Sequence, residues 1–75
     1  MQYYERIRAI REDSDLTQDF VSREILGIGQ RTYSDYESNK TRIPLEAIMK
    51  LARYYDVSMD FITGASNIRK PFPKQ

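Results

Sequence analysis

Apolar residues recur along most of this chain at the three- and four-residue spacing of amphipathic helices. Over residues 3–11, Tyr3, Ile7 and Ile10 fall on one side, while the positions between them are mainly charged. This pattern predicts a first helix with a single buried stripe. A polar stretch at 13–15 then interrupts it.

A second helix is predicted to begin at Thr17 or directly after it. Thr17 can act as the N-cap, and Leu16 and Val21 on either side of it can form a hydrophobic staple. Gly27 ends this helix, because glycine accepts the left-handed conformation that is common just past a helix terminus. The inner face would consist of Val21, Ile25 and Leu26.

A third helix is predicted from Gln30 to about Ser38, with Gly29 as its N-cap and a second staple from Ile28 and Tyr33. Its inner side carries Tyr33, Tyr36 and Glu37. Its outer side is almost wholly polar and consists of Gln30, Arg31, Ser34, Asp35 and Ser38. Asn39 follows as a left-handed C-cap.

A fourth helix is predicted over 44–55, with Pro44 at its first position, and a short fifth helix over 58–63. The inner stripe of the fourth consists of Leu45, Ile48, Leu51, Ala52 and Tyr55. Ser58 caps the fifth, a staple of Val57 and Ile62 holds it, and Gly64 stops it. These patterns predict an all-α domain of five helices over 1–64, followed by a short tail, 65–75, with two prolines.

Composition removes several classes of function. The chain has 75 residues, enough for one domain, and contains no cysteine and no histidine. Disulfides, thiol nucleophiles, imidazole bases and nearly all zinc sites are therefore excluded, so we expect no enzyme, no metal and no cofactor. The charged N-terminus lacks the apolar core of a signal peptide, and no membrane span is found, which predicts a cytoplasmic protein.

Charge is distributed unevenly. Of the 12 basic residues, Arg69, Lys70 and Lys74 lie beyond Gly64, whereas all 11 acidic residues precede it, so residues 1–64 carry a net charge of nine minus 11, or −2. A nucleic-acid-binding role would therefore need a patterned face. The acids expected to be turned away from that face are Glu12, Asp13, Asp56 and Asp60.

A short helix, a turn and a helix with a polar outer face suit insertion into the DNA major groove, which admits one α-helix. Four segments strengthen this interpretation: the L-T-Q opening, T-Y-S-D-Y-E, the K-T-R-I-P loop and L-A-R-Y-Y-D-V-S-M-D-F-I. With them, residues 3–64 resemble the lambda-repressor-like (Xre/Cro-type) helix-turn-helix family. The resemblance implies a compact five-helix fold with the helix-turn-helix at the second and third helices.

The resemblance also implies roles for individual residues. Gln18, at the N-terminus of the second helix, would bind a phosphate through its side chain and nearby backbone N–H groups. Gln30 and Arg31 would read bases, because glutamine pairs with adenine and arginine with guanine, and the candidate face is completed by Thr32, Ser34 and Asp35. A second phosphate clamp would consist of backbone N–H groups with Asn39, Lys40, Thr41 and Arg42.

Arg11 and Glu37 occupy positions where the resemblance implies a partly buried ion pair between the first and third helices. The chain also departs from the family pattern, because the stretch between Gln18 and Glu37 is one residue longer than usual. The second helix or its turn must absorb that residue. Gly29 stands where a serine or threonine cap is common, and Asn39 where glycine is common.

The sequence thus predicts a sequence-specific double-stranded DNA-binding transcriptional regulator, by default a repressor. The alternative is an antitoxin or another protein-interaction module of the same fold, for which we would expect exposed apolar residues on the third helix. Tyr33, Tyr36 and Tyr55 are predicted to pack in the core. The remaining apolar residues exceed what so small a core can hold and predict a homodimer; they are Tyr3, Tyr4, Tyr54, Met59 and Phe72.

Overall fold

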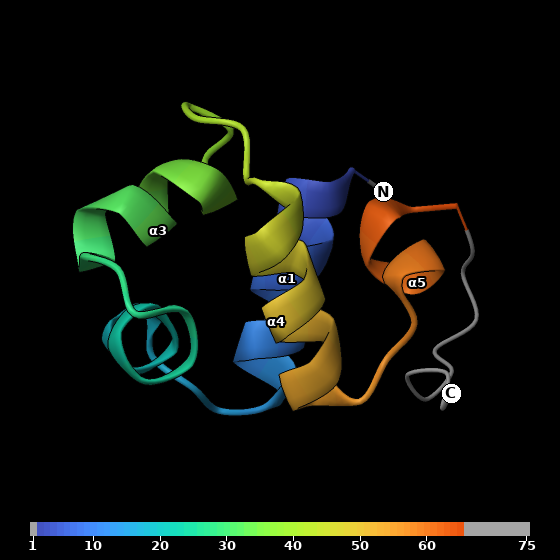
Figure 1. The fold of residues 1–75 in the computed structure, drawn as a ribbon, viewed down its shortest axis with the longest axis horizontal. Helices are drawn as coiled ribbons and strands as arrows, with labels where there is room; N and C mark the ends of the chain where they lie inside the picture. The colour runs from blue at the N-terminus through green and yellow to red at the C-terminus, as the bar shows by residue number, and fades with distance from the viewer. Residues whose placement is uncertain (1, 66–75) are drawn as a thin grey trace.

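A computed structural model describes residues 2–65 of the chain, and every regular element in that range is helical. From the N-terminus the elements are α1 (Tyr3–Asp13), α2 (Gln18–Phe20), the π-helix η1 (Val21–Leu26), α3 (Gln30–Glu37), α4 (Leu45–Tyr55) and α5 (Met59–Thr63). Figure 1 shows α3 and the α2–η1 segment at one end of the molecule, α5 at the other, and α1 and α4 between them. Apart from residue 65, the predicted basic tail, which includes Phe72, lies outside the described residues.

The core draws on every helical segment except the three-residue α2. The largest side chains that are fully buried in it are Tyr33, Ile7, Ile10, Leu51, Ile62, Val21 and Val57. The predicted burial of Tyr36 and Tyr55 is confirmed as well. Arg6 is also buried, and its guanidinium carbon lies 4.1 Å from the centre of the Phe61 ring, so a cation–π contact joins α1 to α5.

The predicted helix boundaries depend on local capping, and most are confirmed. The Thr17 hydroxyl accepts a hydrogen bond from the Phe20 backbone N–H at 3.0 Å, and Ser58 does the same for Phe61 at 3.1 Å. Gly27 (φ 67°) and Asn39 (φ 62°) both adopt the left-handed conformation after their helices. These caps fix where α2 begins and where η1 and α3 end.

The prediction of a regular second α-helix is wrong in detail. After one turn, α2 becomes the six-residue π-helix η1. Because π-type bonds join residues five apart instead of four, such a turn takes up one extra residue without breaking the helix. The π-helix lies within the stretch from Gln18 to Glu37, which the resemblance implies is one residue longer than usual. Ser22 becomes fully buried, with its hydroxyl donating to the Asp19 carbonyl at 2.9 Å, whereas Ile25 is only half-buried.

The prediction for the start of the fourth helix is also partly wrong. Pro44 is the extended N-cap, and α4 begins at Leu45, whose side chain is 64 % exposed instead of joining the inner stripe. At the first helical position the neighbouring elements no longer cover that stripe, and Ala47 is buried in its place. None of the helices in residues 2–65 is both long enough and apolar enough to cross a membrane.

Candidate nucleic-acid interface

Three segments meet around an open hollow of about 400 Å³ at one end of the molecule. They are the N-terminus of α2, the outer side of α3 and the loop that follows α3. The side chains that line the hollow are Gln18, Gln30, Arg31, Ser34, Asp35 and Lys40. All six were predicted from the sequence to contact DNA, although they come from separate segments of the chain.

The polar side of α3 faces outward because the opposite side of the helix is buried in the core. Tyr33, Tyr36 and Glu37 face the core, which leaves Gln30 and Arg31 exposed in the first turn. Ser34 and Asp35, one turn later, are half-buried. The fifth predicted base-reading residue, Thr32, is exposed as well but does not line the hollow.

The loop after α3 folds back onto the helix. The Asp35 carbonyl accepts hydrogen bonds from the backbone N–H groups of Lys40 at 2.9 Å and Thr41 at 3.3 Å. These two N–H groups of the predicted second clamp are therefore engaged within the protein. The side chains of the clamp lie in different places. Of these, only that of Lys40 borders the hollow, whereas Arg42 lines a separate, more apolar one beside Leu45.

Asn39, the remaining member of the predicted clamp, has a structural contact. Its side-chain oxygen accepts a hydrogen bond of 3.4 Å from the Tyr3 hydroxyl. This contact ties the end of α3 to the start of α1. Asparagine is one of the few residue types besides glycine that adopt the left-handed conformation seen here.

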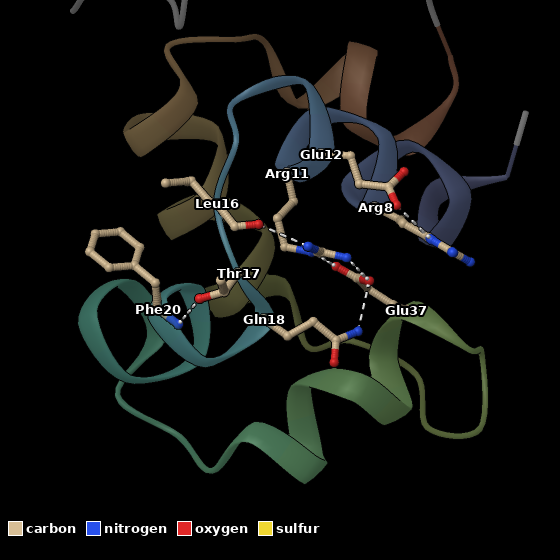
Figure 2. Close-up of polar contacts among 8 residues, drawn as sticks. All are labelled: Arg8, Arg11, Glu12, Leu16, Thr17, Gln18, Phe20 and Glu37. Atoms are coloured by element: carbon tan, nitrogen blue, oxygen red, sulfur yellow. Dashed lines mark hydrogen bonds and ion pairs between the residues drawn. The ribbon is translucent and has the colours of Figure 1, made fainter.

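Figure 2 shows an ion pair between Arg11 of α1 and Glu37 of α3, close to Gln18. Arg11 donates from Nε to Glu37 Oε2 at 2.7 Å and from Nη2 to Glu37 Oε1 at 3.1 Å, and the two side chains are only 12 % and 4 % exposed. Arg11 Nη1 also donates to the Leu16 carbonyl at 2.9 Å. The pair implied by the resemblance is present, and it links α1, α3 and the segment that precedes α2.

Gln18 joins this network. Its side-chain nitrogen donates to Glu37 Oε1 at 3.0 Å, a contact that the sequence interpretation did not include (Figure 2). One side of the predicted phosphate-binding amide is thus held inside the protein. The spacing of Gln18 and Glu37 along the chain gave no signal of it, because the contact depends on how α3 packs against α2.

The electrostatics of Glu37 follow from these contacts. Burial alone would raise the pKa of its carboxyl group, but the hydrogen bonds from Arg11 and Gln18 and the positive charge of Arg11 outweigh burial and lower that pKa. The hydrogen bond with Glu37 in turn raises the pKa of Arg11. Burial, followed by the nearby Glu37 carboxylate, raises the pKa of the Tyr33 hydroxyl. Glu37 is therefore held as a carboxylate at neutral pH.

The sequence interpretation missed Arg8. A second hollow, of about 250 Å³, shares Gln18 and Ser34 with the first and is bordered by Arg8. The Arg8 side chain is 63 % exposed and makes a 3.5 Å ion pair with Glu12. Its position three residues before Arg11, on the same side of α1, was the available signal.

The residues expected to avoid DNA or to mediate self-association lie elsewhere on the surface. Glu12, Asp13, Asp56 and Asp60 are exposed, and none of them lines either hollow beside α3. Tyr54 is 51 % exposed and lies against Phe20, which is 38 % exposed, with ring centroids 6.4 Å apart. Tyr3, Tyr4 and Met59 are half-buried. Among residues 2–65 no three His, Cys, Asp or Glu side chains are grouped to hold a metal ion.

Comparison with known proteins places this arrangement in a family. The "Helix-turn-helix" family model matches residues 7–62. The chain is 38 % identical over 72 residues to the uncharacterized HTH-type transcriptional regulator YobD of Bacillus subtilis, covering 96 % of this chain and 62 % of YobD. It is 40 % identical over 52 residues to the cryptic phage CTXphi transcriptional repressor RstR of Vibrio cholerae, covering 69 % and 46 %.

The fold also matches a solved structure. The P22 c2 repressor, crystallised with a synthetic operator, superimposes with a TM-score of 0.75 at 23 % identity, covering 88 % of this chain and 98 % of that one. The chain spans only about three-fifths of YobD and less than half of RstR. The family match, over most of the described residues, nevertheless includes every residue that lines the two hollows. The chain belongs to the helix-turn-helix family.

Proposed function

We propose that this chain is the DNA-binding domain of a transcriptional regulator, most simply a repressor, that inserts α3 into the major groove of double-stranded DNA. The observation that carries the proposal is the first hollow, where side chains of types that can pair with bases or bind phosphate meet from three segments. The names of YobD, a transcriptional regulator, and RstR, a transcriptional repressor, support it. We propose that the domain ends at Gly64 and acts in the cytoplasm by binding, without catalysis.

Base reading is assigned to the exposed first turn of α3. Gln30 can pair with adenine N6 and N7, and Arg31 with guanine O6 and N7. Asp35, which is half-buried and lines the hollow, can accept a hydrogen bond only from a base donor such as the cytosine amino group. Thr32 and Ser34 complete the set with hydroxyl groups that can either donate or accept.

Phosphate binding is assigned to the rim of the two hollows. Gln18 and Lys40 border the first, and Arg8 borders the second. Asn39, Thr41 and Arg42 remain flanking candidates on the loop after α3. Because residues 1–64 carry a net charge of −2, these few cations must supply the counterion release that supports binding.

The first experiment selects DNA from a randomised pool of duplexes of about 30 base pairs, long enough for two half-sites one helical turn apart. Fluorescence anisotropy then compares the selected duplex with a scrambled one over a range of salt. Arg31→Ala is expected to reduce the preference for the selected duplex about tenfold. Lys40→Ala is expected to weaken binding to both duplexes and to lower the salt slope by about one unit.

The matched control is Lys50→Ala, which removes the same charge from the exposed side of α4, where Lys50 lines neither hollow. It should leave the slope unchanged. Failure to select any sequence and to bind either duplex at ~50 mM salt would overturn the DNA-binding proposal and favour a protein-interaction module, such as an antitoxin whose partner is a protein.

We further propose that the regulator binds as a homodimer. The exposed aromatic pair Phe20–Tyr54 and the 64 % exposed Leu45 are apolar groups that the monomer leaves uncovered. In a dimer with twofold symmetry, two copies of α3 could enter successive major grooves of a palindromic site. Light scattering after size-exclusion chromatography should give twice the monomer mass of 8.9 kDa. If the free protein is a monomer but two copies bind one palindromic duplex, dimerisation is restricted to the complex with DNA.

A further inference from the structure

We propose that Glu37 is a positioning residue for DNA binding. It accepts one N–H of the Gln18 side-chain amide and so directs the other N–H of that nitrogen to a DNA phosphate. This inference rests on the proposed function and adds a role to an ion pair that otherwise only holds helices together. Its structural basis is the 3.0 Å hydrogen bond from the Gln18 side-chain nitrogen to Glu37 Oε1.

The chemistry of the two groups determines which end of the amide Glu37 binds. A carboxylate only accepts hydrogen bonds, so it takes the nitrogen end of Gln18 and is repelled by the oxygen end. The last torsion of a glutamine is broad and nearly twofold, so an unrestrained amide would sample both orientations. Figure 2 shows the amide nitrogen directed to Glu37 and the carbonyl oxygen turned away from it. One N–H of the nitrogen remains as a donor for a phosphate.

Glu37 is itself held by hydrogen bonds and burial, which makes it able to orient another group. Both of its oxygens accept from Arg11, its side chain is 4 % exposed, and Arg11 is also anchored to the Leu16 carbonyl. The Arg11 charge also neutralises the carboxylate, so Glu37 can stand close to a bound phosphate. The orientation of Gln18 is thus set before DNA arrives, which lowers the ordering cost of binding.

A double-mutant cycle on DNA affinity tests this role. The dissociation constant for the pool-selected duplex is measured for the wild type, Gln18→Ala, Glu37→Gln and the double variant, at a temperature where melting curves show each to be folded. Glu37→Gln keeps the shape of the side chain, but its own amide can face Gln18 with either end. Glu46→Gln is the control for the change in net charge, because Glu46 is exposed and lines neither hollow beside α3.

The expected result is non-additive. Glu37→Gln should weaken binding about fivefold when Gln18 is present and less than about twofold in the Gln18→Ala background. A purely structural role for Glu37 would give the same loss in both backgrounds, and that result would overturn the inference. Loss of affinity in Glu46→Gln equal to that in Glu37→Gln would overturn it as well.

A second variant keeps the test decisive if Glu37→Gln does not fold. Gln18→Asn retains the amide but is shorter by one methylene, so it cannot hold the Glu37 bond and reach the same phosphate. It should bind as weakly as Gln18→Ala, whereas wild-type affinity would refute positioning by Glu37. In every arm the wild type must bind the selected duplex; if it does not, the proposed function fails first, and the two failures remain distinguishable.

Discussion

Helix α1 contributes an arginine to each of two ion pairs that differ in almost everything but residue type. Arg8 meets Glu12 on the same helix at 3.5 Å, with side chains 63 % and 56 % exposed. Arg11, one turn later, meets Glu37 of α3 at 2.7 Å, with side chains 12 % and 4 % exposed. The first pair is mostly exposed, whereas the second is nearly buried, and Arg8, Arg11 and Glu37 all line the second hollow.

The difference shows that burial changes what an arginine–glutamate ion pair contributes to the protein. Water and salt screen an exposed pair, whose partners can separate at little cost, so Arg8 is free to exchange Glu12 for another anion. In a buried pair each charge depends on the other, because neither can regain its hydration without unfolding. We therefore expect the Arg11–Glu37 pair to control stability and geometry, and the Arg8–Glu12 pair to affect affinity for DNA.

The largest effect should come from removing one partner of the buried pair. Glu37→Ala leaves the Arg11 guanidinium buried without its carboxylate and should cost about 3 kcal/mol or more of unfolding free energy. Thermal melting at pH 7 should then show a drop of about 12 °C or more for a domain of this size. Glu12→Ala is the control and should change the unfolding free energy by less than about 0.5 kcal/mol. Equal losses in the two variants would remove the distinction drawn between the pairs.

The next effect is a dependence of stability on pH. The pKa of Glu37 is lowered in the folded state, from an ordinary value of 4.5, so its contribution is complete above that value and is lost as pH falls toward the folded pKa. Denaturant melts from pH 7 to pH 3 should therefore show the difference in stability between wild type and Glu37→Gln shrinking below about pH 4.5. Parallel curves for the two proteins would mean that Glu37 titrates alike in the folded and unfolded chains.

Much of the fold could be predicted from the sequence because its local signals agree with the tertiary packing. Thr17, Ser58 and Gly27 mark helix ends through the bonds and conformations that their own residue types favour. The two errors arose where packing overrides a local pattern. Leu45 continues the apolar spacing of α4 beyond the point where other helices cover it, and the π-helix after Phe20 follows a hydrogen-bond pattern that α-helical periodicity does not predict.

The candidate site could be predicted only in part, for a related reason. Gln18, Arg31 and Lys40 were identified from their positions in a recognised pattern, and they do line one hollow. The bond between Gln18 and Glu37, and the place of Arg8 beside the second hollow, depend on how α1, α2 and α3 pack. Such contacts between helices produce no regular spacing of residues that could be recognised in the sequence.

A smaller effect is expected at the exposed arginine. Arg8→Gln should weaken binding of the selected duplex about three- to tenfold and lower the salt slope by about 0.9, the value for one phosphate contact. Its melting temperature should stay close to that of the wild type, because the side chain is mostly exposed. Lys50→Gln, with the same loss of charge on α4, is the control. An unchanged slope in Arg8→Gln would show that the second hollow does not meet the DNA backbone.

The smallest expected effect has the opposite sign. Glu12→Gln removes the carboxylate that now pairs with Arg8 and leaves the guanidinium free for a phosphate, so affinity for the selected duplex should rise about twofold, with stability changed by less than about 0.5 kcal/mol. The same substitution at Glu37 is expected to lower affinity, because that carboxylate orients Gln18. The two variants carry the same change in net charge, so anisotropy at one salt concentration is enough to compare them. Changes of the same sign would mean that net charge, and not the placement of each carboxylate, governs how this domain binds DNA.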